Sequence, residues 1–302
     1  MADPRESAQI AKIKRLAIIA MFSDDSLMNL LVLKGGNALD IVYDLSTRSS
    51  LDLDFSIAGQ FPRESLPDIE RRIRQALEET FRLSGYQVFD FRFAERPEEV
   101  AEEVRSFWGG YRIEFKVIET AKGSALRGNR DSMRRNAAVI GPRQQRTLEI
   151  EISKYEYVGP KQERELDHYT VFVYSPAMLV IEKLRAICQQ MPDYAAIVST
   201  HSRRARAKDF FDIYSLIERF HIDLLARENV DLLKACFLAK QVPLAFLGEM
   251  ALFRDYHAQD YPSLKATVLP GAELREFDFY FDYVLGKVAS LEPFGEVQPP
   301  PR

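Results

Sequence analysis

The chain has 302 residues, of which 46% are hydrophobic and 28% are charged, so disorder is excluded as its main state. The length predicts about two domains or one large one. Lys and Arg total 41 against 45 Asp and Glu, and a net charge of −4 leaves nucleic-acid binding only to a local basic patch. Two cysteines exclude a disulfide scaffold or a cysteine zinc cluster. We expect a soluble cytoplasmic protein, because no signal peptide or membrane span is evident.

The first half of the chain mixes helical and strand-like patterns. Helical periodicity predicts helices over 7–22, 38–43 and 65–83, and apolar–polar alternation predicts strands over 51–57, 86–93, 111–119 and 147–154. A short apolar run at 30–33 is followed by Gly35 and Gly36. The Glu-rich stretch 95–103 predicts an exposed acidic helix. This half therefore predicts an α+β domain.

The second half changes character, because strand patterns almost disappear after 171–174. Ser175 and Pro176 predict the start of a helix, since serine can cap a helix and proline suits its first position. Helical periodicity then covers 176–190, 203–220, 228–240 and parts of 272–291. We expect one domain over 1–170 and a mainly helical domain over 171–302.

Two acids on one predicted strand are the most informative feature. Strand side chains alternate between faces, so Asp52 and Asp54 point to the same side while Leu53 points into the core. Neighbouring carboxylates repel each other unless a cation lies between them, and oxygen ligands favour a hard ion such as Mg²⁺. Taken alone, an Asp-x-Asp pair is more often a solvated face.

A glycine pair precedes these acids. Gly35 and Gly36 lie between an apolar run and a predicted helix, where glycines let backbone amides approach a phosphate at the positive helix end. Taken alone, such a pair is usually a turn. Combined with the acids and with Arg48 just before them, it indicates Mg²⁺-nucleotide chemistry. Glu151 could be a third metal ligand, or could lie on an edge strand with one wet face.

Two charged residues fall on apolar faces of predicted helices. The helical neighbours of Lys183 are all apolar, so its ammonium requires an anionic partner, either a structural carboxylate or a ligand phosphate. Asp209 begins another apolar stripe, and helix-dipole compensation, a salt bridge to Lys183 and a substrate contact are all open interpretations. Asp212 is predicted to be structural, paired with Lys208 or Arg206.

Basic residues gather in two stretches of this net-acidic chain. The first stretch, 121–146, contains one acid, Asp131, and these cations: Lys122, Arg127, Arg130, Arg134, Arg135, Arg143 and Arg146. The second contains Arg203, Arg204, Arg206 and Lys208. Such segregation suggests a polyanion site, although a charge run is more often a solvated face.

Together these segments resemble the AbiEii/AbiGii-type toxin family of nucleotidyltransferases, in the polymerase-beta-like superfamily. Four ordered blocks carry the resemblance: Lys34-Gly35-Gly36-Asn37-Ala38-Leu39; Arg48-Ser49-Ser50-Leu51-Asp52-Leu53-Asp54; Ser175-Pro176 through Glu182-Lys183-Leu184-Arg185-Ala186; and Arg206-Ala207-Lys208-Asp209-Phe210-Phe211-Asp212-Ile213-Tyr214. They span roughly residues 30–220. The resemblance implies a nucleotidyltransferase domain with a mixed sheet, and a helical domain that contributes Lys183 and Asp209 to the active-site cleft.

The resemblance also implies roles for individual residues. Asp52 and Asp54 would hold Mg²⁺ or Mn²⁺, with Glu151 as the possible third ligand, and Asp209 would be an active-site acid and a general base. The nucleoside triphosphate would contact Lys34, Gly35, Gly36, Asn37, Arg48 and Lys183. Two positions depart from the family pattern, since Asn37 stands where Thr or Ser is common and Glu151 where Asp is usual.

Such proteins are similar to toxins of toxin–antitoxin or phage-defence systems, and some relatives transfer nucleotides onto the acceptor end of tRNA. We therefore predict transfer of a nucleoside monophosphate to RNA, with the tRNA 3′ end as acceptor and a nearby-encoded antitoxin as partner. One alternative is nucleotidyl transfer to a protein side chain, such as AMP attachment. Another is a catalytically silent RNA-binding module. No base-reading motif identifies the nucleotide.

Overall fold

The computed structural model describes residues 4–45, 48, 50, 52–141, 144–269 and 271–291. The chain divides into two compact units. The first, which we call the sheet unit, comprises Met1–Ser46, Ser50–Val100 and Gly109–Val173. The second, the helical unit, comprises Thr47–Ser49, Ala101–Trp108 and Tyr174–Arg302.

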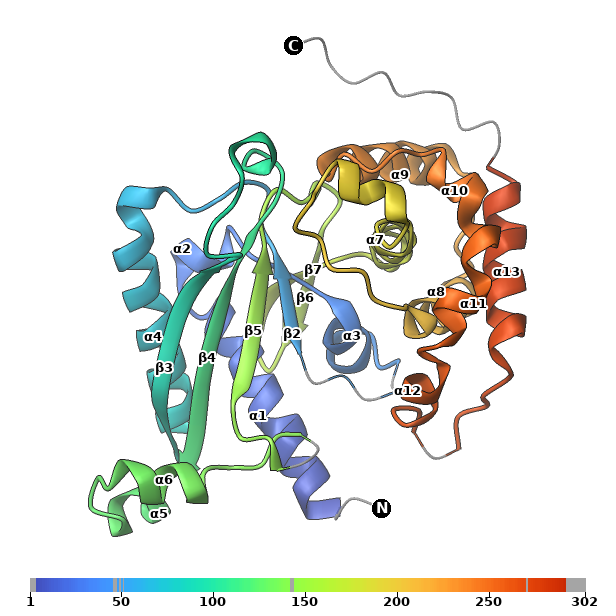
Figure 1. Ribbon diagram of the computed structural model, residues 1–302. Helices are drawn as coiled ribbons and strands as arrows, with labels where there is room; N and C mark the ends of the chain where they lie inside the picture. Colours follow the sequence, from blue (N-terminus) through green and yellow to red (C-terminus); the bar gives the residue numbers. More distant parts are fainter. Residues whose placement is uncertain are drawn as a thin grey trace. The chain divides into compact units, whose positions relative to one another are not determined.

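The sheet unit contains a seven-stranded sheet in the order β3-β4-β5-β2-β1-β7-β6 (Figure 1). Its strands are β1 Val32–Lys34, β2 Leu53–Ser56, β3 Tyr86–Arg96, β4 Gly110–Glu119, β5 Leu148–Ser153, β6 Gln162–Leu166 and β7 Tyr169–Val173. Strand β2 is parallel to β5 and antiparallel to β1, which is parallel to β7. The mixed sheet confirms the predicted α+β class.

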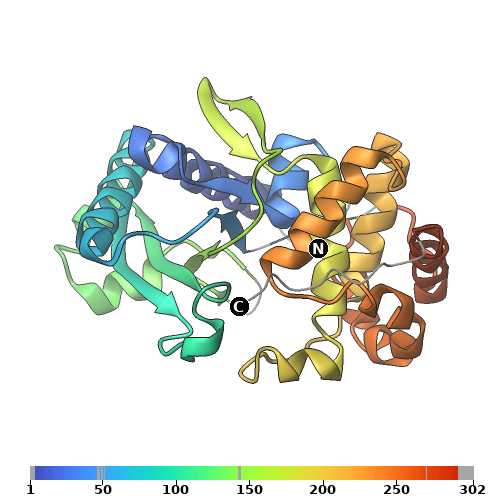
Figure 2. The same ribbon diagram turned by 90° about the horizontal axis from the view of Figure 1, so that it is seen from above.

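Two long helices cover one face of this sheet (Figures 1 and 2). Helices α1 (Pro4–Phe22) and α4 (Leu66–Leu83) lie against each other, and their rings reach strand residues: Phe22 contacts Phe55, and Phe81 contacts Phe115. In β4 the buried side chains alternate with partly exposed charged ones, as the period of two requires. The opposite face of the sheet therefore carries the charged residues.

Short helical segments complete the sheet unit. Helix α3 (Gly35–Asn37) and the π-helix η1 (Ala38–Val42) follow β1 directly. The others are α2 Asp25–Met28, the 3₁₀ turn η2 Arg63–Ser65, α5 Thr120–Ala125 and α6 Arg130–Asn136.

The helical unit packs four longer helices: α7 Pro176–Cys188, α8 Ala207–Phe220, α9 Arg227–Ala239 and α13 Phe277–Ala289. The ring of Phe210 stacks on Phe281 at 4.9 Å between centroids and meets Phe277 edge-on. Shorter segments are η3 Glu102–Val104, η5 Pro192–Ala196, α10 Phe246–Glu249, η6 Met250–Phe253, α11 Arg254–Ala258 and α12 Tyr261–Lys265. Within the described residues, no helix combines the length and apolar character that crossing a bilayer requires.

Three local predictions were wrong. Stretch 95–103 forms no α-helix: Glu95 and Arg96 end β3, and Glu102–Val104 is a 3₁₀ turn, because the stretch has no apolar stripe that could pack. Helix α8 begins at Ala207 rather than 203, since the preceding segment is bonded to Gln190 instead. Strand β6 was missed because its side chains are polar and mostly exposed.

Candidate active site

A row of charged side chains crosses four strands of the sheet unit. The register pairs Arg112 of β4 with Glu151 of β5, Glu151 with Asp54 of β2, and Asp54 with Lys34 of β1. Directly opposed side chains share a face of a sheet. Asp54 therefore lies on the charged face, opposite the one that α4 covers, and it is partly exposed.

A second row next to it contains only acids. Asp52 is exposed and directly precedes β2, while Glu149 of β5 is paired with Glu114 of β4. Burial is the main cause that raises the pKa of Glu149, and Glu114 and Asp52 raise it further while Arg112 opposes them. Negative charge thus accumulates beside the predicted acid pair. Glu114 and Glu149 were not among the predicted site residues, although alternation along their strands signals them.

Gly35 is fitted to Asp54. Its φ of +72° lies in the left-handed region that glycine favours, and an added Cβ would come within 3.1 Å of Cγ of Asp54 and closer still to Oδ2. A side chain at this position would push the carboxylate away. The glycine therefore lets the backbone of the turn and the Asp54 carboxylate lie side by side.

Asn37 is a buried residue that binds the main chain of Asp52. Its side chain is fully buried, and Nδ2 donates a hydrogen bond of 2.6 Å to the carbonyl oxygen of Asp52. Its Oδ1 is buried without a hydrogen-bond partner among the described residues. In this arrangement the side chain holds the main chain of Asp52, and the backbone of 35–37 is what lies next to the acids.

Two other predicted residues are engaged by neighbours. Lys34 is 6% exposed, and its Nζ lies 3.5 Å from Oε1 of the buried Glu156. Strand β5 lies inside the sheet, so the edge-strand interpretation of Glu151 was wrong. Oε1 of Glu151 accepts a 2.9 Å hydrogen bond from Nη2 of Arg112.

The donor set can be compared with the needs of a metal ion. Within the described part of the chain, no three Asp, Glu, His or Cys side chains are placed to hold one. Asp52 and Asp54 nevertheless supply the oxygen donors that a hard divalent cation prefers, in a region of excess negative charge. They fit such an ion better than Glu151 does, because Arg112 holds Glu151.

Lys14 is a further charged residue at this end of the sheet unit. It is 6% exposed, and its Nζ donates a hydrogen bond to the carbonyl oxygen of Ser50. Burial lowers the pKa of Lys14, while Asp40 and Asp52 oppose that shift. The sequence signal was available, because Lys14 falls on the apolar stripe of α1, but it was not used.

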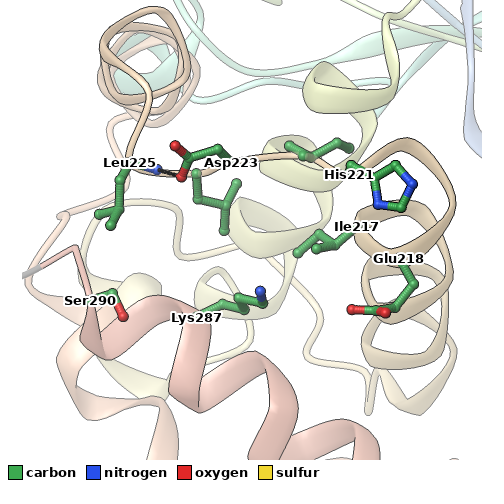
Figure 3. Close-up of a pocket in the computed structure, with 9 residues that line it drawn as sticks. Ile217, Glu218, His221, Asp223, Leu225, Lys287 and Ser290 are labelled. Carbon is green, nitrogen blue, oxygen red and sulfur yellow. Dashed lines mark hydrogen bonds between the residues drawn. The ribbon is translucent and has the colours of Figure 1, made fainter.

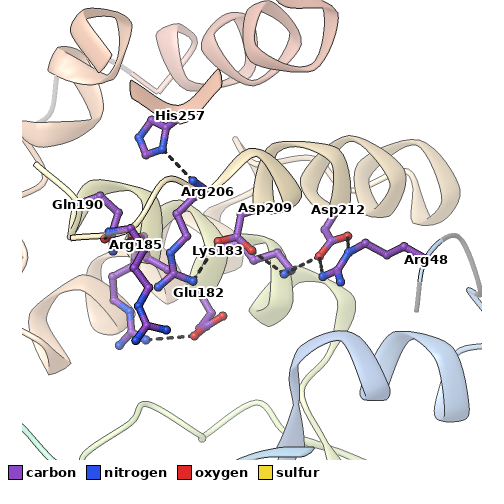
Figure 4. A network of polar contacts seen from close by, with 11 residues as sticks. Arg48, Glu182, Lys183, Arg185, Gln190, Arg206, Asp209, Asp212 and His257 are labelled. Carbon is purple, nitrogen blue, oxygen red and sulfur yellow. Dashed lines mark hydrogen bonds and ion pairs between the residues drawn. The ribbon is translucent and has the colours of Figure 1, made fainter. Parts of the chain in front are cut away.

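The remaining predicted residues form a chain of alternating charges in the helical unit (Figure 4). Nε and Nη2 of Arg48 donate to the carboxylate of Asp212 at 2.7 and 2.6 Å. Nζ of Lys183 lies 2.7 Å from Oδ2 of Asp212 and 2.9 Å from Oδ1 of Asp209. Nη1 of Arg206 lies 3.4 Å from Oδ2 of Asp209. Asp212 is thus paired with Arg48 and Lys183, not with Lys208 or Arg206 as predicted.

These pairings keep the buried groups ionised. Burial alone would lower the pKa of Lys183, but Asp209 and Asp212 outweigh it and raise the pKa. Burial would raise the pKa of Asp212, but Arg48 and Lys183 lower it to about 2. Lys183 and Arg206 likewise hold the pKa of Asp209 below its ordinary value against the effect of burial. A carboxylate so stabilised is a weak proton acceptor.

Arg206 ends the row of contacts in this network. The three cations Arg48, Lys183 and Arg206 face the two acids Asp209 and Asp212. Nε of Arg206 is buried without a hydrogen-bond partner in the described ranges. Arg206 therefore retains a donor that an anion could use.

The helical unit also contains a pocket of about 370 Å³, which is separate from the charged network (Figure 3). His221, Glu218 and Lys287 line it, at the C-terminal end of α8, whereas Asp209 lies in the first turn of that helix. No residue predicted for the site lines this pocket, and we do not assign it to the candidate site.

Comparison with known proteins shows that the chain is a nucleotidyltransferase. The chain belongs to the AbiEii nucleotidyltransferase toxin family of type IV toxin–antitoxin systems, whose family model matches residues 17–283. The crystal structure of JHP933 from Helicobacter pylori is similar, with a TM-score of 0.50 and 17% identity over 96% of both chains.

A second H. pylori crystal structure, of a protein provisionally named a nucleotidyltransferase, has a TM-score of 0.50 and 18% identity over 96% of this chain and 99% of that one. At such identities these structures show the fold alone. A comparison with curated proteins finds no match.

Proposed function

We propose that this toxin transfers a nucleoside monophosphate from a nucleoside triphosphate to an RNA and releases pyrophosphate. The acceptor in this proposal is the hydroxyl group at the 3′ end of a tRNA. The observation that carries the proposal is the acid pair, with Asp52 exposed and Asp54 partly exposed, beside a glycine turn whose backbone closely approaches Asp54. A cognate antitoxin is the protein partner that this family implies.

Asp52 and Asp54 are the residues that would hold a divalent cation. When bound, Mg²⁺ or Mn²⁺ supplies positive charge between these carboxylates and the triphosphate. The backbone amides of Gly35 and Gly36 would orient the phosphates, which requires no side chain at Gly35. Asn37 fixes the main chain of Asp52 and so keeps one acid in place.

Lys183, Arg48 and Asp209 serve the same reaction in this proposal through the buried network. Arg206 has a buried donor without a partner among the described residues, which could bind a triphosphate oxygen. Asp209 holds Lys183 and Arg206 in position. Its lowered pKa supports this positioning role better than the role of general base.

Label transfer tests the proposal. The purified protein is incubated with Mg²⁺ and each of the four nucleoside triphosphates labelled at the α-phosphate, together with total tRNA or total cell protein. We expect label on tRNA from one or more nucleotides and no label with Asp54→Asn. Label on protein would support AMP attachment instead, and tRNA binding without transfer from any nucleotide would support a silent RNA-binding module.

A further inference from the structure

The connection between β4 and β5 is much longer than the sheet requires. These strands are antiparallel neighbours, and a turn of two residues can join such a pair. The chain instead inserts residues 120–147 there, including α5 and α6. In this insertion, which we call the basic lobe, Leu126, Met133 and Ala137 pack against Phe89 of β3 and Ile118 of β4 and form a small apolar core. Such a core indicates a built feature rather than a slack loop.

The surface of the basic lobe is strongly positive. Five of its cations are exposed: Lys122, Arg127, Arg130, Arg134 and Arg135. Two further cations belong to this stretch of the sequence. Arg143 lies outside the described residues, and Arg146 donates a hydrogen bond to the carbonyl oxygen of Ala137. The lobe therefore carries exposed cations in and between its two short helices.

One carboxylate organises the cations nearest the sheet. Asp90 lies at an irregularity of β3 with a φ of +52°, and its side chain is 15% exposed. Nε of Arg134 lies 2.6 Å from it, Lys116 lies 3.6 Å away and Arg130 lies 3.8 Å away. Asp131 also accepts from Nη1 of Arg134 at 3.3 Å, so two carboxylates contact these three cations. Asp90 and Asp131 thus fix the positions of these side chains, and the three other exposed cations, Lys122, Arg127 and Arg135, add to the positive charge that remains.

The basic lobe lies on the same face of the sheet as the acid pair. Side chains alternate between the two faces along β4, and every second one faces α4. Ile118, which belongs to the lobe core, and Lys116 lie on the opposite face, together with Glu114 and Arg112. Glu114 is paired with Glu149 in the acidic row, and Ile118 lies four residues further along the strand. At roughly 3.3 Å per residue, the lobe begins about 13 Å from that row.

We infer that the basic lobe binds the phosphodiester backbone of the RNA acceptor and so brings its 3′ end to the acid pair. This inference rests on the proposed function. Guanidinium groups match phosphate geometry, and phosphate contacts fix the register of a nucleic acid on a protein. A protein partner is less well matched, because protein interfaces need an apolar core. No large apolar side chain of residues 120–136 is exposed.

A charge-reversal variant tests the inference. The lobe variant combines Lys122→Glu, Arg127→Glu and Arg135→Glu. None of these three residues takes part in the contacts described above for Asp52 and Asp54. The control variant combines Arg227→Glu, Lys234→Glu and Lys287→Glu, three exposed cations of the helical unit, and changes the net charge equally. Fluorescence anisotropy with labelled tRNA gives Kd over a range of salt concentrations, and label transfer gives KM for tRNA, KM for nucleotide and kcat.

We expect the lobe variant to bind tRNA at least tenfold more weakly than the control. The slope of log Kd against log salt should fall by about 0.7–0.9 for each phosphate that the lobe no longer neutralises. KM for tRNA should rise, while KM for nucleotide and kcat at saturating tRNA stay unchanged. If the triple reversal does not fold, as shown by thermal melting, the neutral variant with Gln at the same three positions replaces it, with a smaller loss of the same kind expected.

If the lobe variant keeps the tRNA affinity and salt slope of the control, the inference is overturned. Transfer of label to tRNA by the unsubstituted protein would still uphold the proposed function in that case. Unchanged tRNA binding with loss of an acidic protein partner would assign the basic lobe to that partner and overturn the inference as well. Label on protein alone would refute the proposed function, and the anisotropy measurement would still decide whether the lobe binds RNA.

Discussion

The two charged regions of this protein follow opposite physical rules. On the sheet unit, acids lie side by side at least partly exposed to solvent, and their mutual repulsion raises the pKa of Glu149 beyond the effect of burial. In the helical unit, Lys183 and Asp212 are buried and each faces opposite charges. A bound cation would reduce the repulsion between acids in the first region, whereas the ion pairs of the second region already balance most of its charge. Removing one charged group should therefore lower mainly activity in the first region, whereas in the second region it should also lower stability.

The largest expected effect is the loss of stability in Lys183→Met. This change leaves Asp209 and Asp212 buried without their shared cation, which typically costs about 3–5 kcal/mol of unfolding free energy. Urea unfolding followed by circular dichroism measures it. As a control, Lys183→Met combined with Asp212→Asn should recover part of the loss, because one buried charge is removed. A loss below about 1 kcal/mol would show that the network is not stabilising as described.

Asp54→Asn should instead lower activity with little effect on stability. Loss of a charged group that acts on the reacting phosphates typically reduces the rate by a factor on the order of 10² or more. The melting temperature should stay the same or rise slightly, since a like charge is removed. Label transfer and thermal melting measure the two effects. Glu78→Gln on the exposed side of α4 is the matched control, and normal turnover in Asp54→Asn would refute the assignment.

Acid should destabilise the helical unit within a defined pH window. Arg48 and Lys183 hold the pKa of Asp212 at about 2, below its ordinary value of 3.8. A lowered folded-state pKa stabilises the fold above pH 4, and this contribution, on the order of 2 kcal/mol, is lost as the pH falls from about 4 to 2. Urea unfolding at several pH values measures it. Asp212→Asn should flatten this pH dependence, and an equally steep dependence in that variant would contradict the prediction.

Gly35→Ala tests how closely the glycine turn and Asp54 are fitted. The substitution combines an unfavourable φ with a Cβ inside contact distance of the Asp54 carboxylate, and we expect a loss of about 1–3 kcal/mol together with reduced transfer. Gly59→Ala is the matched control, because an added Cβ there meets nothing within 4 Å. Equal stability and activity in the two variants would show that Asp54 can move aside without consequence.

Local patterns predicted much of this structure, and long-range pairing explains the rest. Period-two alternation was enough to find β2 and to place Asp54 away from the core, and periodicity alone showed that Lys183 needs an anionic partner. No local signal could show that Arg48 pairs with Asp212, 164 positions along the chain. The order of strands likewise depends on tertiary contacts, which is why β5 was not recognised as an interior strand. The catalytic roles of the site residues stay predictions.

Glu151→Gln should have the smallest effect and would sharpen the comparison within the charged face itself. Arg112 already engages Glu151 with a hydrogen bond of 2.9 Å, which a metal ion would have to displace. We expect transfer to fall less than tenfold, equivalent to less than about 1.4 kcal/mol, and stability to change little because the pair is half exposed. Steady-state label transfer measures the change. A loss as large as that of Asp54→Asn would instead make Glu151 the third metal ligand, and Arg112 would then have to release it whenever the metal binds.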